Sequence, residues 1–272
     1  MLIRKIAFST FYLCSLSAFA AYKPQTKWVG TWTASPMACP VRSGEPSAGD
    51  MTYRNVVRIS IGGNVFRVLL TNEFGTSQLM VGSAHIAMNS GDGAIQPGTD
   101  HILTFSGHPS VTIPAGGFVL SDEVTMTAPA LSSLAVSLYT KDQEIAIRSC
   151  HLLASSTNYA VKGDITGAAT IKGARAIESW TFVKGIEARV DENAFSIVAL
   201  GDSITDGNAS TKDSNHRWPD YLASRLQGAN RTARVAVLNE GIVGNRILRS
   251  EWGQSAITRF DRDVLGKPEH VT

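Results

Sequence analysis

The sequence predicts an all-β sandwich of jelly-roll-like type over residues 21–190, followed over residues 191–272 by part of an α/β domain with a parallel sheet. The first prediction rests on many short apolar segments that are separated by Gly, Pro, Asn and Asp. The second rests on two continuous apolar runs, each followed by a segment with helical spacing. The change of pattern near residue 190 marks the boundary between the two domains.

The clearest β pattern is "NVVRISIGGNVFRVLLTNEF", residues 55–74. Apolar residues recur at every second position in residues 57–61 and again in residues 66–70, as in half-buried strands. Gly62 and Gly63 lie between the two halves and favour a tight hairpin turn, so we expect the halves to pair with each other. Further strand candidates are residues 81–88, 101–105, 109–120 and 134–140.

The α/β pattern begins with "AFSIVAL" (residues 194–200), a continuous apolar run that suits a strand buried on both faces. "RWPDYLASRLQG" (residues 217–228) then predicts a helix, with Pro219 in its first turn and Gly228 at its end. "ARVAVL" (residues 233–238) predicts the second buried strand. This alternation is typical of a parallel sheet with right-handed crossovers.

A second helix is predicted for "SAITRFDRDVLG" (residues 255–266), and "HVT" (residues 270–272) could begin a third strand. Several apolar side chains of this helix share one stripe, which we expect to be its buried face. The stripe consists of Ile257, Phe260, Val264 and Leu265.

Residues 1–20 are predicted to be an export signal. The basic start "MLIRK" precedes the short apolar stretch "IAFSTFYLCSLSAFA", and Ala18-Phe19-Ala20 fits cleavage after Ala20. The stretch is too short for a typical membrane span, so we expect a secreted or periplasmic protein with no stable span after cleavage. An uncleaved anchor is the alternative.

Cysteine usage agrees with export, because Cys14 lies in the signal and leaves Cys39 and Cys150 as an even pair. A disulfide between them would close a loop of about a hundred residues and stabilise the fold by up to roughly 4–5 kcal/mol. Two buried, unpaired thiols are the other interpretation. The separated cysteines and scattered histidines lack the ligand spacing of a metal site. The net charge of +2, without a run of Lys or Arg, argues against a nucleic-acid partner.

The most informative motif is "GDSITDG", residues 201–207, directly after the first apolar run. Ligands of open parallel sheets bind beyond the carboxyl ends of the strands, which is where Ser203 is expected. Gly201 and Gly207 allow the backbone to bend and to approach a substrate closely. The motif differs from the Gly-x-Ser-x-Gly elbow, because position 205 is Thr. Alternatively, Ser203 only caps the following segment.

This motif resembles the first motif of the GDSL esterases, also called SGNH hydrolases. Their second motif, a glycine after the next strand, is matched by Gly244 in "LNEGIVGNRIL". Two shorter strings, "WVGTWTASP" and "RISIGGN", resemble the secreted branch that carries a β-rich domain ahead of the hydrolase. The resemblance implies a flavodoxin-like SGNH domain over residues 191–272, of which roughly residues 193–272 carry the match.

The resemblance also implies roles for single residues. Ser203 would be the catalytic nucleophile, and its backbone N–H and that of Gly244 would form the oxyanion hole. Asp202 would shape the turn, and Asn245 adjoins the oxyanion loop and could touch substrate. Two alternatives remain: Gly244 could be only a turn glycine, and Asn245 only a loop residue.

Two further motifs of the family, Gly-x-Asn-Asp and Asp-x-x-His, are absent from the sequence. We therefore expect the catalytic histidine to lie beyond Thr272, in a chain that looks truncated. His216 is the alternative base, because it follows Ser203 most closely, whereas His270 is expected at the opposite end of the sheet. The remaining histidines of the β-rich region are expected to be surface or structural residues: His85, His101, His108 and His151.

The sequence thus predicts a secreted serine esterase that acts without a cofactor on acetylated carbohydrates or small esters. No long apolar segment indicates the lid of a true lipase. The alternative is a secreted carbohydrate-binding β-sandwich with a non-catalytic hydrolase remnant. Exposed Trp28, Trp32 or Trp180 would favour it, because sugar rings stack on aromatic faces, although each could equally be a core residue.

Overall fold

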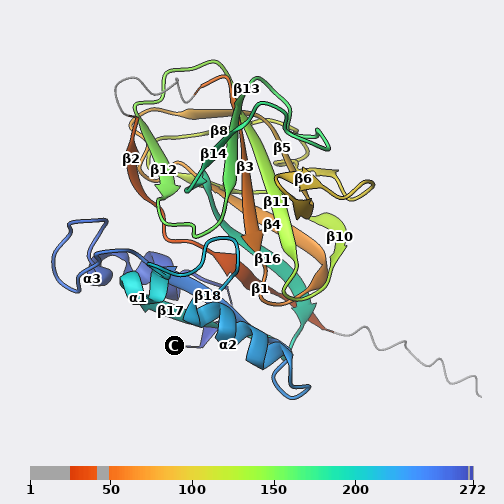
Figure 1. Ribbon diagram of the computed structural model, residues 1–272, viewed down its shortest axis with the longest axis vertical. Coiled ribbons are helices and arrows are strands. Elements are labelled where there is room, and N and C mark those ends of the chain that lie inside the picture. Colours follow the sequence, from red (N-terminus) through yellow and green to blue (C-terminus); the bar gives the residue numbers. More distant parts are fainter. Residues whose placement is uncertain (1–24, 42–48, 269, 272) are drawn as a thin grey trace, which may run out of the picture.

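The computed structural model describes residues 25–41, 49–268 and 270–271. The predicted export signal, with Cys14, lies outside these residues. A large β-rich unit (residues 25–191) packs against a smaller C-terminal unit (residues 195–271) that contains all the helical segments of the described residues (Figure 1). Within the described residues, no helix has both the length and the apolar character needed to cross a membrane.

Two antiparallel sheets form most of the β-rich unit. One has the strand order β1-β16-β4-β10, with β9 paired to β4. Its strands are β1 (Thr26–Thr33), β16 (Val183–Asp191), β4 (Gly63–Thr71), β10 (Val124–Ala128) and β9 (Phe118–Leu120). The other has the order β14-β13-β3-β11-β5-β6, with β7 and β8 paired to β5. Its strands are β14 (Arg175–Ile177), β13 (Asn158–Lys162), β3 (Met51–Arg58), β11 (Ser133–Thr140), β5 (Leu79–Gly91), β6 (Ala94–Ile95), β7 (His101–Ile102) and β8 (Val111–Ile113).

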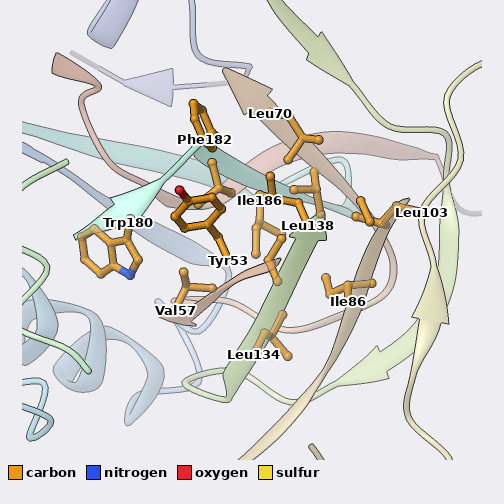
Figure 2. Close-up of a cluster of buried hydrophobic side chains, with 14 of the residues drawn as sticks. Tyr53, Val57, Leu70, Ile86, Leu103, Leu134, Leu138, Trp180, Phe182 and Ile186 are labelled. Atoms are coloured by element: carbon orange, nitrogen blue, oxygen red, sulfur yellow. The ribbon is translucent and has the colours of Figure 1, made fainter. Parts of the chain in front are cut away.

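The main hydrophobic core takes side chains from both sheets (Figure 2). In β4, Phe66, Val68 and Leu70 are fully buried and alternate with less buried neighbours, as the period of a strand requires. Trp32 and Trp180 belong to this core and pack edge to face, with ring centroids 5.0 Å apart. These two indole rings are therefore core residues and not exposed platforms for sugar stacking.

The predicted hairpin at Gly62 and Gly63 is wrong. β3 pairs with β11 and β13, whereas β4 pairs with β16, β9 and β10, so the two alternating halves lie in different sheets. The connecting segment crosses between the sheets, where the Ser60 N–H donates to the Thr31 carbonyl at 2.8 Å. A Cβ at Gly62 would lie 2.5 Å from the Ala128 carbonyl oxygen, so this glycine serves a close backbone crossing.

A third, small sheet in the β-rich unit has the order β15-β12-β2. Its strands are β15 (Trp180–Thr181), β12 (Ile147–His151) and β2 (Met37–Pro40). Cys39 of β2 and Cys150 of β12 form a disulfide with a Cα–Cα distance of 6.0 Å. Met37, Ile242 and the disulfide pack as one buried cluster, so the disulfide lies directly against the C-terminal unit.

The C-terminal unit contains a parallel sheet of order β18-β17-β19. Its strands are β18 (Val235–Gly241), β17 (Phe195–Gly201) and β19 (His270–Val271), and its helical segments are α1 (Ser203–Asp206), α2 (Trp218–Gln227), α3 (Ala256–Phe260) and the π-helical η1 (Asp261–Leu265). As predicted, α2 has Pro219 in its first turn and ends at Gly228. Val29, Ile61, Ala194 and Ala236 join the two units in a small apolar cluster.

The predicted apolar stripe of the last helix is wrong in three of its four positions. Ile257, Phe260 and Leu265 are exposed, and only Val264 is buried. The buried face instead carries Arg259 and Asp263, each with a side-chain exposure of 0%. These charged residues are buried because polar groups of both units surround them, as the next section describes.

Candidate functional site

Ser203 lies just beyond the carboxyl end of β17. Asp202 caps the short helix α1, with its Oδ1 accepting a hydrogen bond of 3.0 Å from the Ile204 N–H. Gly207 ends the turn in the left-handed conformation at φ 99°, and its N–H donates to the Ser203 carbonyl. Within the described part of the chain, the Ser203 hydroxyl has no hydrogen-bond partner and is half-buried. The hydroxyl is therefore unengaged at the edge of the sheet.

Two glycines at the strand ends allow α1 to pack closely against the sheet. Gly201 and Gly241 are paired in the parallel register of β17 and β18. A Cβ at Gly201 would lie 2.2 Å from the Thr205 Oγ1, and one at Gly241 would lie 2.2 Å from the Asp206 backbone nitrogen. Both distances are far shorter than a van der Waals contact. Positions 201 and 241 therefore have no room for a side chain, and only glycine fits there.

Asp206, inside the first motif, connects the Ser203 turn to the rest of the site. It is buried; its Oδ2 accepts the Val243 N–H at 2.7 Å and its Oδ1 lies 2.9 Å from the His151 Nε2. The other ring nitrogen of His151, Nδ1, lies 2.9 Å from the Ser35 carbonyl oxygen. Val243 precedes Gly244, so one carboxylate holds both the Ser203 turn and the glycine loop.

The surroundings of His151 favour its imidazolium form. A carbonyl oxygen and a carboxylate are both acceptors, so hydrogen bonds to both require a proton on each ring nitrogen. Burial lowers the pKa of His151, but the charge of Asp206 and the hydrogen bonds to Asp206 and Ser35 outweigh it and raise the pKa above 6.5. His151 is thus a buried structural partner of Asp206, and neither of its nitrogens is available to Ser203.

Gly244 lies in the loop that follows β18. It is exposed and has φ 69°, a left-handed conformation that favours glycine. The Asn245 N–H closes the turn onto the Ile242 carbonyl at 3.0 Å, and the Ile242 N–H donates to the Gly201 carbonyl at 3.1 Å. Within the described residues, the Gly244 N–H has no hydrogen-bond partner. The loop therefore presents a free N–H beside the end of β17.

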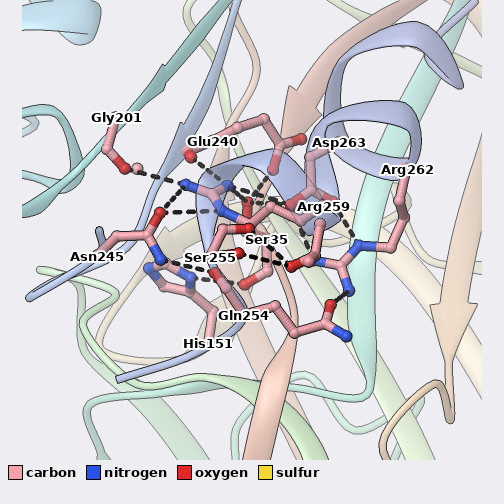
Figure 3. A network of polar contacts seen from close by, with 12 residues as sticks. Ser35, His151, Gly201, Glu240, Asn245, Gln254, Ser255, Arg259, Arg262 and Asp263 are labelled. Carbon is pink, nitrogen blue, oxygen red and sulfur yellow. Dashed lines mark hydrogen bonds and ion pairs between the residues drawn. The ribbon is translucent and has the colours of Figure 1, made fainter. Parts of the chain in front are cut away.

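Arg259 connects the ends of both strands to this loop (Figure 3). Its Nη2 donates to the Gly201 carbonyl at 3.0 Å and to the Asn245 Oδ1 at 2.9 Å. Its Nη1 donates to the Glu240 carbonyl at 2.7 Å and to the Ser35 hydroxyl at 2.9 Å. One guanidinium therefore joins the ends of β17 and β18 to the side chains of Asn245 and Ser35. Asn245 is held by this contact and by its own donation to the Gln254 carbonyl at 2.7 Å.

Acidic partners neutralise the buried cations of this network. Asp263 accepts from Arg262 at 2.6 Å and from Arg259 at 3.1 Å, and Glu240 pairs with Lys267 at 2.6 Å. Burial raises the pKa of Asp263, but the hydrogen bond and charge of Arg262 and the charges of Lys267 and Arg259 outweigh this effect and lower the pKa from 3.8 to about 2. The Ser35 hydroxyl lies 2.5 Å from the Glu240 Oε2, which ties the β-rich unit into the same network.

The structure places the candidate bases away from a contact with Ser203. His216 stacks on Tyr221, with ring centroids 5.4 Å apart, and His85 pairs with Asp100. His270 pairs through its backbone with Ser196, at the opposite end of β17 from Ser203. Among the described residues, none of the histidines bonds to Ser203, and no group of three metal-ligating side chains occurs.

Five residues of the site were not predicted from the sequence. Asp206 lies within the quoted motif, and Arg259 and Asp263 are four residues apart with opposite charges, a spacing that indicates a helical ion pair. These three could have been found. His151 and Ser35 come from distant strands and loops of the β-rich unit, and no local pattern indicates their contact with Asp206.

A serine at the carboxyl end of a parallel strand, next to a glycine loop with a free N–H, is an arrangement typical of serine hydrolases. Residues 199–272 match the model of the GDSL-like Lipase/Acylhydrolase family, which supports the resemblance of this part of the chain to the GDSL hydrolases. The curated proteins contain no match to the chain.

Proposed function

We propose that the protein is a secreted carboxylic-ester hydrolase in which Ser203 attacks the ester carbonyl and forms an acyl-enzyme. The match of residues 199–272 to the acylhydrolase family model supports ester hydrolysis as the reaction class. The observation that carries the assignment is the unengaged Ser203 hydroxyl at the end of β17. Acetylated carbohydrates and small esters are the proposed substrates, and export is proposed from residues 1–20. The proposal also includes a jelly-roll-like β-rich unit and a flavodoxin-like hydrolase domain.

The Ser203 and Gly244 N–H groups are proposed to bind the oxyanion. Charge develops on the carbonyl oxygen in the transition state, and a donor already in place stabilises it without reorganisation. The contacts of Asp206 and Arg259 hold the two segments that carry these donors. A serine hydroxyl also needs a base, and the family resemblance assigns this role to a histidine outside the contacts described above.

The test is hydrolysis of p-nitrophenyl acetate together with labelling by a fluorophosphonate, which modifies activated serines. The folded protein should release p-nitrophenol and gain one phosphonyl adduct on Ser203, and Ser203→Ala should lose both. Ser210→Ala, at a neighbouring serine of the same loop, is the matched control and should keep both. Ester hydrolysis that persists in folded Ser203→Ala would contradict the proposal, as would an adduct on another serine.

A further inference from the structure

A polar groove lies where the β-rich unit meets the C-terminal unit. It has a volume of about 330 Å³. One wall comes from the eight-stranded sheet and the other from the segment between α1 and α2, which leads away from Ser203. We name it the junction groove, defined by Arg58, Asn89, Asp92, Tyr159, Asp213 and Asn215.

Several polar groups of the junction groove lack partners. The Asn89 Oδ1 is buried and accepts no hydrogen bond, while the Asn89 Nδ2 reaches the Ser133 hydroxyl only at 3.3 Å. Within the described residues, the Tyr159 hydroxyl and the Asn215 amide also have no hydrogen-bond partner. A buried polar group without a partner costs free energy, so such groups favour a ligand that supplies the missing bonds.

The walls of the groove are fixed before any ligand binds. Asp213 accepts two hydrogen bonds from Thr157, from its N–H at 2.5 Å and its hydroxyl at 2.7 Å. On the other side, the buried Arg54 donates to the Gly93 carbonyl at 2.7 Å, which fixes the turn that carries Asp92. A rigid site loses little conformational entropy on binding, which favours affinity for a small polar ligand.

The backbone conformation of three groove residues also indicates that the walls of the groove are fixed. Asp92, Asp213 and Asn215 all have positive φ, at 48°, 61° and 51°. Non-glycine residues persist in such conformations where the surrounding contacts enforce them. Asp and Asn tolerate this region better than other residues, so the groove keeps its shape at a moderate cost.

The charges of the groove select the class of ligand. Asp92 and Asp213 both raise the pKa of Tyr159, after burial, so its phenol stays a neutral hydrogen-bond donor. Arg217 is neutralised by Asp220 at 2.7 Å. The carboxylates of Asp92 and Asp213 outweigh the single positive charge of Arg58, which disfavours a polyanion. Hydroxyl groups, in contrast, can donate to carboxylates and accept from amide and phenol groups. Alternating donors and acceptors of this kind are the chemistry of a neutral sugar.

We propose that the junction groove binds a neutral saccharide chain, with Tyr159, Asn89 and Asn215 hydrogen-bonding to its hydroxyl groups. Saccharide binding in the junction groove is independent of the proposed function. The further step, that the groove is a subsite for an esterified sugar substrate, rests on the proposed function. From the C-terminal unit, Asp213, Asn215 and Arg217 line the groove, so a bound chain would contact both units.

The test measures binding without catalysis. Affinity electrophoresis in xylan, glucomannan and galactan, with polygalacturonate as the polyanion, is combined with a printed array of neutral oligosaccharides. At least one neutral glycan should retard the protein, and polygalacturonate should not. Tyr159→Phe and Asn215→Ala should weaken this binding about three- to tenfold, the range for one neutral hydrogen bond. Tyr221→Phe, a tyrosine outside the groove, is the matched control and should bind normally.

Three results would overturn the proposal: no neutral glycan binds, polygalacturonate binds more tightly than every neutral glycan, or Tyr159→Phe binds as tightly as Tyr221→Phe. Unchanged melting temperatures show that the variants are folded. Ser203→Ala separates the two proposals, because it should abolish ester hydrolysis and leave saccharide binding unchanged. Saccharide binding by a protein that hydrolyses no ester would support the groove on its own.

Discussion

The guanidinium of Arg259 donates a 3.0 Å hydrogen bond to the carbonyl of Gly201, the residue on which β17 ends. The same side chain is fully buried and contacts the segments on either side of Gly244. A charge in this position cannot be solvated by water, so its partners must remain in place. The geometry around Ser203 therefore depends on a residue that never reaches the surface.

Arg259→Met should destabilise the protein by about 3–5 kcal/mol, because it leaves Asp263 buried without one of its cationic partners. Arg259→Lys should cost less, since it keeps the charge and loses only the fork of donors. Urea unfolding measures the free energy of unfolding of both variants. Arg225→Met, at an exposed arginine of α2, is the control and should change stability by less than about 0.5 kcal/mol. Equal effects at positions 259 and 225 would contradict the prediction.

The raised pKa of His151 predicts how stability depends on pH. A folded pKa above the unfolded value of 6.5 means that the stabilisation is complete below that pH and is lost as the pH rises through the folded pKa. His151→Gln removes this contribution. The difference in Tm between wild type and variant should therefore be larger at pH 6 than at pH 9. A difference that grows with pH would show that His151 is buried in its neutral form.

The lowered pKa of Asp263 predicts the opposite dependence of stability on pH, in the acid range. Its pKa of about 2 lies below the unfolded value of 3.8, so its contribution is present above pH 3.8 and is lost as the pH falls through 2. Wild type should lose roughly 2 kcal/mol more than Asp263→Asn between pH 4 and pH 2, measured by urea unfolding at each pH. Asp261→Asn, at an exposed neighbour, should follow wild type, and parallel curves for all three proteins would exclude this role of Asp263.

Gly241→Ala should destabilise the protein by about 1–3 kcal/mol, because its Cβ would collide with the backbone of Asp206. It should also lower esterase activity, since Asp206 holds the Ser203 turn and the glycine loop. Gly228→Ala is the matched control: its φ is −71°, and the nearest atom to its Cβ is at 3.4 Å. This change should be neutral or stabilising by up to about 1 kcal/mol. The two variants are compared by thermal unfolding.

The sequence was sufficient for local elements with a strong pattern. The strand before Ser203 and the proline-started helix α2 follow from side-chain periodicity and backbone preference. The predicted burial of that strand on both faces is wrong, because only Ser196 and Ala199 of β17 are buried. The alternation across Gly62 also predicted strands, but sheet membership depends on long-range pairing that no local signal specifies. The last helix failed for another reason. A hydrophobic stripe is expected to face the core. Here the side of the helix that faces the rest of the protein carries the buried ion pair of Arg259 and Asp263, and most of the apolar stripe is exposed.

Because Ser35 and His151 contact the C-terminal unit, the two units of the protein depend on each other. A polypeptide of residues 191–272 alone would leave Asp206 without its imidazolium partner and Arg259 without the Ser35 hydroxyl. Replacing the β-rich unit with an unrelated sandwich would have the same effect. We therefore expect the two units to be inherited together, with Ser35, His151, Asp206 and Arg259 varying as a set when homologues are compared.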